Sequence, residues 1–193
     1  MAVKEQKFSI LTFNSGSDWE QWLSENHDHF DSVWLRFFKK DSGVDGITYY
    51  EALDGAICYG WIDGQIQKYD EQSYLRKFTL RRPQSTWSKR NKEHVARLEK
   101  AGRVQASGWK KIEEAKENGR WDNAYDSQGN MEMPEDFLRE LKKNKEAYAF
   151  YNTLNSTNRY SIAWRLQTAR TPETRSRRMK KILKMMANKE KFH

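Results

Sequence analysis

The chain has 193 residues, of which 37% are hydrophobic and 13% aromatic, and it carries a formal net charge of +8. Eight Trp, nine Tyr and nine Phe argue against a disordered chain, because such chains are poor in the aromatic residues that fill a core. No segment reaches the roughly 20 apolar residues of a membrane span, the N-terminus lacks a signal peptide, and the single Cys excludes an internal disulfide, so we expect a soluble, cytoplasmic protein.

The first half of the chain predicts helices and strands in alternation. A helix over 17–27 begins at a capping box of Ser17 and Glu20, and residues 33–38 form a β-branched and aromatic strand. A second capping box, Thr48 with Glu51, begins a helix that ends at Gly60, since glycine enters the left-handed conformation without a Cβ penalty. Residues 61–69 and 74–82 alternate apolar and polar side chains around DEQS, which predicts an antiparallel hairpin.

The second half predicts helices only. They cover residues 88–102, 107–119, 134–143, 145–154, 159–169 and 172–186, with Pro134 and Pro172 at first helical positions. In the last helix, capped by Thr171, apolar residues recur at i, i+3, i+4 and i+7 and predict a seam that docks on the body: Met179, Ile182, Leu183 and Met186. We therefore expect an α+β fold, with a small antiparallel sheet of about three strands packed with helices and then an all-helical C-terminal half. The mixed part spans 1–120 and the helical part 131–193, together one compact unit.

Three sequence blocks carry a resemblance to a known family: GWIDG, RRPQSTWSKRN and TPETRSRR. Together they are similar to the YdeI/OmpD-associated family, also called bacteriocin-protection proteins, over about residues 47–191. The family name implies tolerance of bacteriocins or antimicrobial peptides and an association with an outer-membrane porin, hence the periplasm. The absence of an export signal instead favours the cytoplasm.

The stretch CYGWIDGQ contains the candidates for a small pocket: Tyr59, Trp61, Asp63 and Gln65. Cys58 has no histidine at a recognisable catalytic spacing and lies on the apolar face of a helix, so we expect a buried thiol. Asp63 is either a general base or the anchor of an arginine such as Arg76, Arg81 or Arg82, and the second interpretation is favoured. No catalytic residue, metal site or cofactor is assigned, and a small enzyme with this pocket remains an alternative.

Two basic segments are the strongest functional signal. Residues 76–111 carry 12 Lys or Arg against two Glu, and residues 159–193 carry 11 against two. Guanidinium groups and an aromatic plane are suited to phosphates, carboxylates and bases. The candidates for anion binding are Arg76, Arg81, Arg82, Trp87, Lys89, Arg90, Asn91, Arg175 and Arg178.

We therefore expect a non-enzymatic module that binds nucleic acid, another polyanion or an acidic protein. Two alternatives remain: the basic helix faces are merely solvated, or Arg175 and Arg178 pair inward with acidic residues of the mixed half. A further alternative, which the resemblance implies, is a tolerance protein that sequesters a peptide or a partner.

Overall fold

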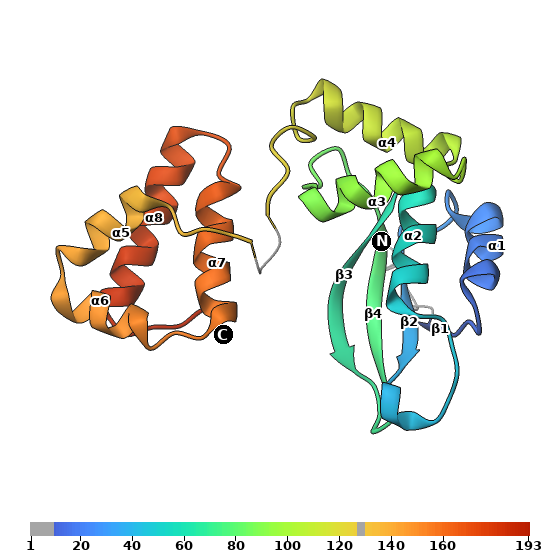
Figure 1. Ribbon diagram of the computed structural model, residues 1–193, viewed down its shortest axis with the longest axis horizontal. Coiled ribbons are helices and arrows are strands. Elements are labelled where there is room, and N and C mark those ends of the chain that lie inside the picture. Colours follow the sequence, from blue (N-terminus) through green and yellow to red (C-terminus); the bar gives the residue numbers. More distant parts are fainter. Residues whose placement is uncertain (1–9, 127–129) are drawn as a thin grey trace, which may run out of the picture. The chain divides into compact units, whose positions relative to one another are not determined.

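The computed structural model describes residues 10–126 and 130–193 (Figure 1). The chain divides into two compact units. The first, here called the mixed unit, comprises residues up to Thr86 together with Asn91–Asp122. The second, the helical unit, comprises Trp87–Arg90 and Asn123–His193. That the whole chain forms one compact unit stays a prediction.

The mixed unit is built on a four-stranded sheet in the order β1-β2-β4-β3. Strands β2 (Ser32–Phe38), β3 (Trp61–Lys68) and β4 (Ser73–Leu80) are antiparallel neighbours, as predicted. Strand β1 (Ile10–Leu11) adds a parallel partner to β2, so the sheet is mixed and has one strand more than the sequence predicts. Two residues are too few to show the alternation by which a strand is recognised in a sequence.

The helices of the mixed unit begin and end at identifiable residues. In α1 (Gly16–Asn26), Ser15 forms the capping box with Asp18, so the predicted box of Ser17 and Glu20 is wrong by two residues. The predicted box of Thr48 with Glu51 is confirmed for α2 (Tyr49–Cys58). A short 3₁₀ turn at Lys40–Ser42 lies between β2 and α2. Helices α3 (Lys89–Lys100) and α4 (Ala106–Glu117) follow the β3–β4 hairpin.

The core of the mixed unit lies between one face of the sheet and the helices α1 and α2. Burial alternates along β2, where Val33, Leu35 and Phe37 point into the core. Trp19 of α1 and Trp61 of β3 are fully buried there, with their rings edge to face at 6.4 Å. Each large aromatic ring removes 150–250 Å² of surface from water in general, so a few rings compensate for the low hydrophobic fraction.

The helical unit contains α5 (Glu135–Lys142), α6 (Lys145–Asn152), α7 (Ser156–Gln167) and α8 (Pro172–Ala187). Pro134 is the residue that precedes α5, one position earlier than predicted. The cap at Thr171 and Pro172 at the first position of α8 are as predicted. The predicted seam of α8 is confirmed, because Ile182 and Met186 are buried in the core of this unit. The remaining two residues of the seam, Met179 and Leu183, pack against that core.

Candidate functional site

The stretch CYGWIDGQ is a buried turn between α2 and β3. Cys58 is 1% exposed, and burial raises the pKa of its thiol to about 12, so at neutral pH it is a protonated apolar side chain. Gly60 has φ +78°, which confirms the left-handed residue expected after the helix. The turn is closed by two backbone bonds: Gln105 N–H donates to Cys58 O (3.0 Å) and Arg81 N–H to Gly60 O (3.0 Å).

The four pocket candidates do not converge on one surface. Trp61 is in the core, Gln65 is exposed on the edge strand β3, and Tyr59 packs its ring against His27 at 5.3 Å. Asp63 forms an ion pair with Arg76 and accepts a hydrogen bond from the Tyr49 hydroxyl (3.0 Å).

The Arg76 guanidinium also lies over the Tyr49 ring at 4.1 Å. An arginine and a phenol therefore occupy Asp63, as expected of a carboxylate that anchors an arginine. Both partners bind Oδ2 and hold the carboxylate in place, which favours the role of an anchor over that of a general base.

The candidates from the first basic segment divide between the interior and the surface. Arg81 is 2% exposed and its Nη1 donates to Thr86 O (3.1 Å), while Trp87 and Asn91 are also buried. These three residues therefore do not form the exposed basic surface that the sequence predicts. Along RRPQSTWSKRN, these buried residues are interspersed with exposed cations, so the block contains an inward face that its composition does not reveal.

Three of the candidate cations of this segment are exposed: Arg82, Lys89 and Arg90. The Lys89 ammonium lies 2.8 Å from Asp126, and its backbone N–H donates to Tyr125 O (2.9 Å) within the helical unit. Lys89 is thereby partly neutralised, so the charge of this block is smaller than its composition indicates.

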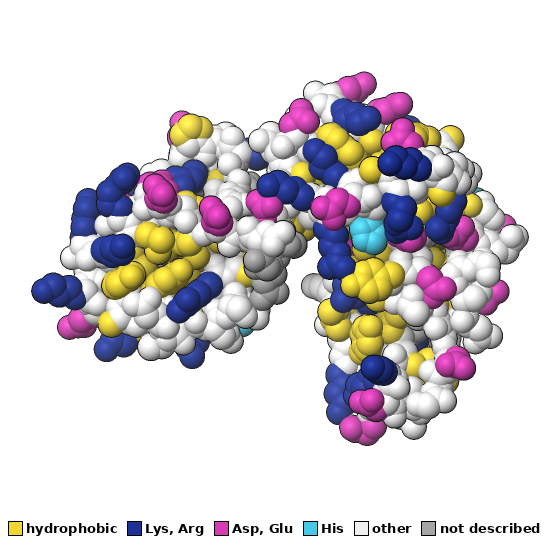
Figure 2. Space-filling model, viewed as in Figure 1, with side chains coloured by type: hydrophobic (Ala, Val, Ile, Leu, Met, Phe, Trp, Pro, Cys, Tyr) yellow, Lys and Arg dark blue, Asp and Glu magenta, His cyan; other side chains and the backbone are white. Residues whose placement is uncertain are grey.

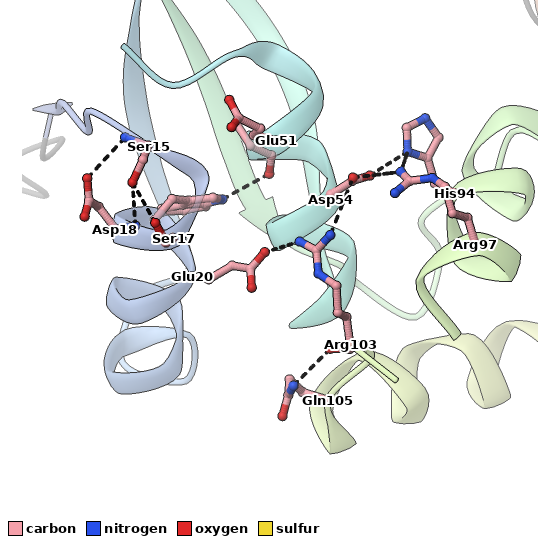
Figure 3. Close-up of polar contacts among 12 residues, drawn as sticks. Ser15, Ser17, Asp18, Glu20, Glu51, Asp54, His94, Arg97, Arg103 and Gln105 are labelled. Atoms are coloured by element: carbon pink, nitrogen blue, oxygen red, sulfur yellow. Dashed lines mark hydrogen bonds and ion pairs between the residues drawn. The ribbon is translucent and has the colours of Figure 1, made fainter. Parts of the chain in front are cut away.

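A charged cluster that the sequence analysis missed lies between α1, α2 and α3 (Figure 3). Asp54 of α2 is 7% exposed and receives His94 Nδ1 at 2.7 Å and Arg97 Nη2 at 2.6 Å, both from α3. Arg103 lies on another side, with Nη1 4.0 Å from Asp54 and an ion pair to Glu20 of α1. In the sequence, the signal is a single acidic residue within the buried face of α2, LDGAI.

The charges of this cluster balance among themselves. Two carboxylates face two guanidinium groups, and the His94 ring is held by the central carboxylate. The five members come from four segments: α1, α2, α3 and the residues after α3. The cluster therefore ties these segments together and leaves little net field for a charged ligand.

Helix α8 contains cations of two kinds. Arg175 forms a bidentate pair with Asp136 of α5 (2.5 and 2.8 Å), and Arg178 Nη1 donates to Arg165 O (2.8 Å). Both point inward, as one alternative proposed, but their partners belong to the helical unit and not to the mixed half. The bidentate geometry lowers the pKa of the Asp136 carboxyl.

The other cations of α8, Arg177, Lys180, Lys181 and Lys184, are exposed. Three of them, Arg177, Lys181 and Lys184, lie at i, i+4 and i+7, which places them on one side of the helix. Among the residues that the structure describes, none of the three has an ion-pair partner. We call Arg177, Lys181 and Lys184 the α8 row. Figure 2 shows Lys and Arg side chains around the rim of the visible face of the helical unit, with apolar side chains at its centre.

The positive charge of the protein is concentrated in the helical unit. This unit has 17 Lys and Arg against 8 Asp and Glu, a net charge of +9, whereas the mixed unit has 18 against 19, a net charge of −1. An open pocket of about 500 Å³ lies at the start of α8, with Asp136, Arg170 and Arg175 in its wall. The excess of cations is therefore associated with α8 and its surroundings.

Neither a group of metal ligands nor a membrane-spanning helix is present in the part of the chain that the structure describes. Over residues 10–126 and 130–193, no three His, Cys, Asp or Glu side chains are grouped as metal ligands. Within the same ranges, no helix has the length and apolar character needed to cross a membrane. The cytoplasmic location stays a prediction.

Two family profiles match the chain. The profile described as a domain of unknown function, DUF8412, matches residues 11–111, which include the sheet of the mixed unit, the GWIDG block and the first half of α4. The profile described as bacteriocin-protection, YdeI or OmpD-associated matches residues 130–189, which include TPETRSRR and helices α5–α8. No curated protein and no solved structure matches the chain. The chain therefore belongs to the DUF8412 family, and its helical unit matches the bacteriocin-protection, YdeI or OmpD-associated profile that the sequence blocks predict.

Proposed function

We propose that the chain is a non-enzymatic module that binds an anionic partner, a nucleic acid or an acidic protein, through the basic surface of its helical unit. The observation that carries this proposal is the α8 row. Arg177, Lys181 and Lys184 are exposed, lie on one side of a 16-residue helix and have no ion-pair partner among the described residues. Three cations fixed on one helix face match the repeated charges of a polyanion.

The contrast with neighbouring arginines supports this assignment. Arg175 and Arg178 satisfy a carboxylate and a backbone carbonyl, so they hold α8 on α5 and α7. The α8 row contributes no such contact among the described residues. Exposed charges of one sign repel one another and weaken the folded state slightly, so three in a row favour a role in binding over a role in stability.

The charge balance of the two units also supports this proposal. A net charge of +9 on about 75 residues produces a positive potential that attracts polyanions over about one Debye length, roughly 8 Å at physiological salt. The mixed unit, with a net charge of −1, lacks this property.

The proposal is tested by fluorescence anisotropy with labelled DNA, RNA and poly-glutamate at several salt concentrations. The test variant is Arg177→Gln, Lys181→Gln, Lys184→Gln, because glutamine preserves helix propensity and removes three charges. The control variant is Lys40→Gln, Lys100→Gln, Lys110→Gln, which removes three exposed charges from the mixed unit.

We expect the test variant to bind the preferred polyanion at least 10-fold more weakly. For duplex DNA, its log–log salt slope should fall by up to about 2.7 if all three cations contact phosphates. The control variant should bind like the unmodified protein. Equal affinities of the two variants would contradict the proposal.

A further inference from the structure

We propose that the sheet face opposite α1 and α2 binds the bases of single-stranded nucleic acid, with Trp34 as the main stacking platform. This inference rests on the proposed function and narrows its anionic partner to one chemical class. It adds a second binding surface, on the mixed unit, to the basic surface of the helical unit.

The sheet has one core face and one face outside the core. Strands β2 and β4 are its central strands, and α1 and α2 pack on the side of Val33 and Phe78. The alternate residues of β2 point to the other side: Trp34, Arg36 and Phe38. All three are partly exposed, and none belongs to the core cluster. Lys77 of β4 lies directly opposite Trp34 in the register and shares this face.

Trp34 is unusual among the tryptophans of the chain. Of the eight, it is the one that makes no hydrogen bond, ring contact or cation-π contact with the described residues. The indole N–H of a buried Trp usually has a partner, and large aromatic rings pair readily. A partly exposed indole on a central strand, whose N–H has no partner among the described residues, is suited to stack on a base.

Arg36 is held flat on the same face. Its guanidinium lies over the Phe38 ring at 4.7 Å and the Tyr69 ring at 5.1 Å, while Nε and Nη2 donate to Ser73 Oγ (2.9 Å) and Asp70 (2.7 Å). Two rings and the Asp70 carboxylate therefore already engage this guanidinium, which fixes its position on the face. The plane that β2 offers to a base is the indole of Trp34, two residues away on the same strand.

The chemistry of the face selects single-stranded nucleic acid among possible occupants. Sequence-tolerant binding of single strands combines aromatic planes on a sheet with cations for the backbone, and here Trp34 of β2 supplies a plane and Lys77 of the adjacent strand a cation. A duplex keeps its bases stacked internally and cannot use this plane. A purely apolar partner would leave Arg36 and Lys77 against apolar surface.

The test compares oligo(dT) and oligo(U) with duplex DNA and heparin by fluorescence anisotropy. Trp34→Leu keeps an apolar side chain but removes the aromatic plane, and Trp34→Phe restores a plane. Trp109→Leu is the matched control, because Trp109 is also partly exposed but lies on α4. Lys77→Gln tests the cation by itself.

We expect Trp34→Leu to weaken binding of single strands by roughly 5- to 150-fold, the range for one lost base stack. Trp34→Phe should recover most of this loss, and heparin and duplex affinities should not change. Lys77→Gln should reduce the salt slope for single strands by about 0.7. If Trp34→Leu does not fold, the quenching of tryptophan fluorescence by oligo(dT) decides the question: Trp34→Phe should remove part of this quenching, and an unchanged quenching would overturn the inference.

Three further results would overturn the inference. One is an unchanged affinity of Trp34→Leu for single strands, and another is a wild-type protein that binds heparin and duplex but not single strands, which leaves the proposed function intact. The third is that the unmodified protein is a dimer and Trp34→Leu a monomer in sedimentation equilibrium, while both bind single strands equally well. This face would then be an interface between two copies of the chain. Absence of binding to every probe would instead contradict the proposed function itself.

Discussion

Replacement of Gly108 by alanine should destabilise the mixed unit more than any other Gly→Ala substitution on a helix or strand. A Cβ at Gly108 would lie 2.2 Å from Cys58 O and 3.0 Å from Ile57 O, whereas a carbon and a carbonyl oxygen in contact are usually about 3.3–3.6 Å apart. Both obstacles are backbone atoms at the end of α2, so α4 must retreat by about 1 Å.

The cost follows from three terms. Overpacking costs about 1–3 kcal/mol, here near the upper end because no flexible side chain can yield. The same retreat lengthens the bond from Gln105 N–H to Cys58 O, which contributes about 1 kcal/mol. Alanine returns about 1 kcal/mol of helix propensity. The net loss is about 2–3 kcal/mol, equivalent to a fall in Tm of roughly 4–12 °C.

The assay is urea unfolding followed by tryptophan fluorescence, with Gly64→Ala as the matched control. A Cβ at Gly64 meets its nearest atom, Lys77 O, at 3.7 Å, an ordinary contact, so this variant should stay within about 0.5 kcal/mol of the unmodified protein. Equal stabilities of the Gly108 and Gly64 variants would refute the close approach of α4 to α2.

Three further predictions concern capping, the thiol and acid stability. Thr48→Ala removes the hydroxyl that accepts from Glu51 N–H, and its free energy of unfolding in urea should fall by about 1 kcal/mol; no change would mean that the capping box contributes nothing. Cys58 should react with a thiol reagent at pH 7.5 only after urea unfolding, because burial raises its pKa to about 12; rapid reaction of the folded protein would contradict this. Asp136 has a pKa below its usual value because Arg175 donates to it, so the pair stabilises the helical unit above about pH 4 and loses this contribution as the pH falls through the folded-state pKa. Asp136→Asn should therefore flatten the acid side of the stability profile by a few tenths of a kcal/mol, since both side chains are about one-third exposed. An unchanged profile between pH 5 and 2 would refute the assignment.

Local signals in the sequence predicted most of the fold. The cap at Thr48, the left-handed Gly60 and the seam of α8 each depend on neighbours within one or two helical turns, which the sequence displays directly. Strand β1 was missed because its pairing with β2 involves residues more than 20 positions away. Ser15 and Ser17 are both capable caps, and the position of the first helical turn decided between them.

The site was harder to predict because exposure is a tertiary property. Arg81 and Arg82 are adjacent and chemically identical, yet one is buried and the other exposed. The partner of Arg175 is 39 residues away, and the partners of Asp54 are 40 and 43 residues away, so neither pairing has a local signature. Composition correctly indicates an excess of cations, but only the fold separates those that stabilise the protein from those in the α8 row.

The most direct test of the central proposal is the affinity of the unmodified protein and of its two triple-glutamine variants for a labelled polyanion, measured across a salt series. The proposal predicts binding that weakens steeply with salt, weakens at least 10-fold when Arg177, Lys181 and Lys184 are neutralised, and is unchanged when Lys40, Lys100 and Lys110 are neutralised. Binding that is indifferent to the α8 row, or no binding even at low salt, would contradict it.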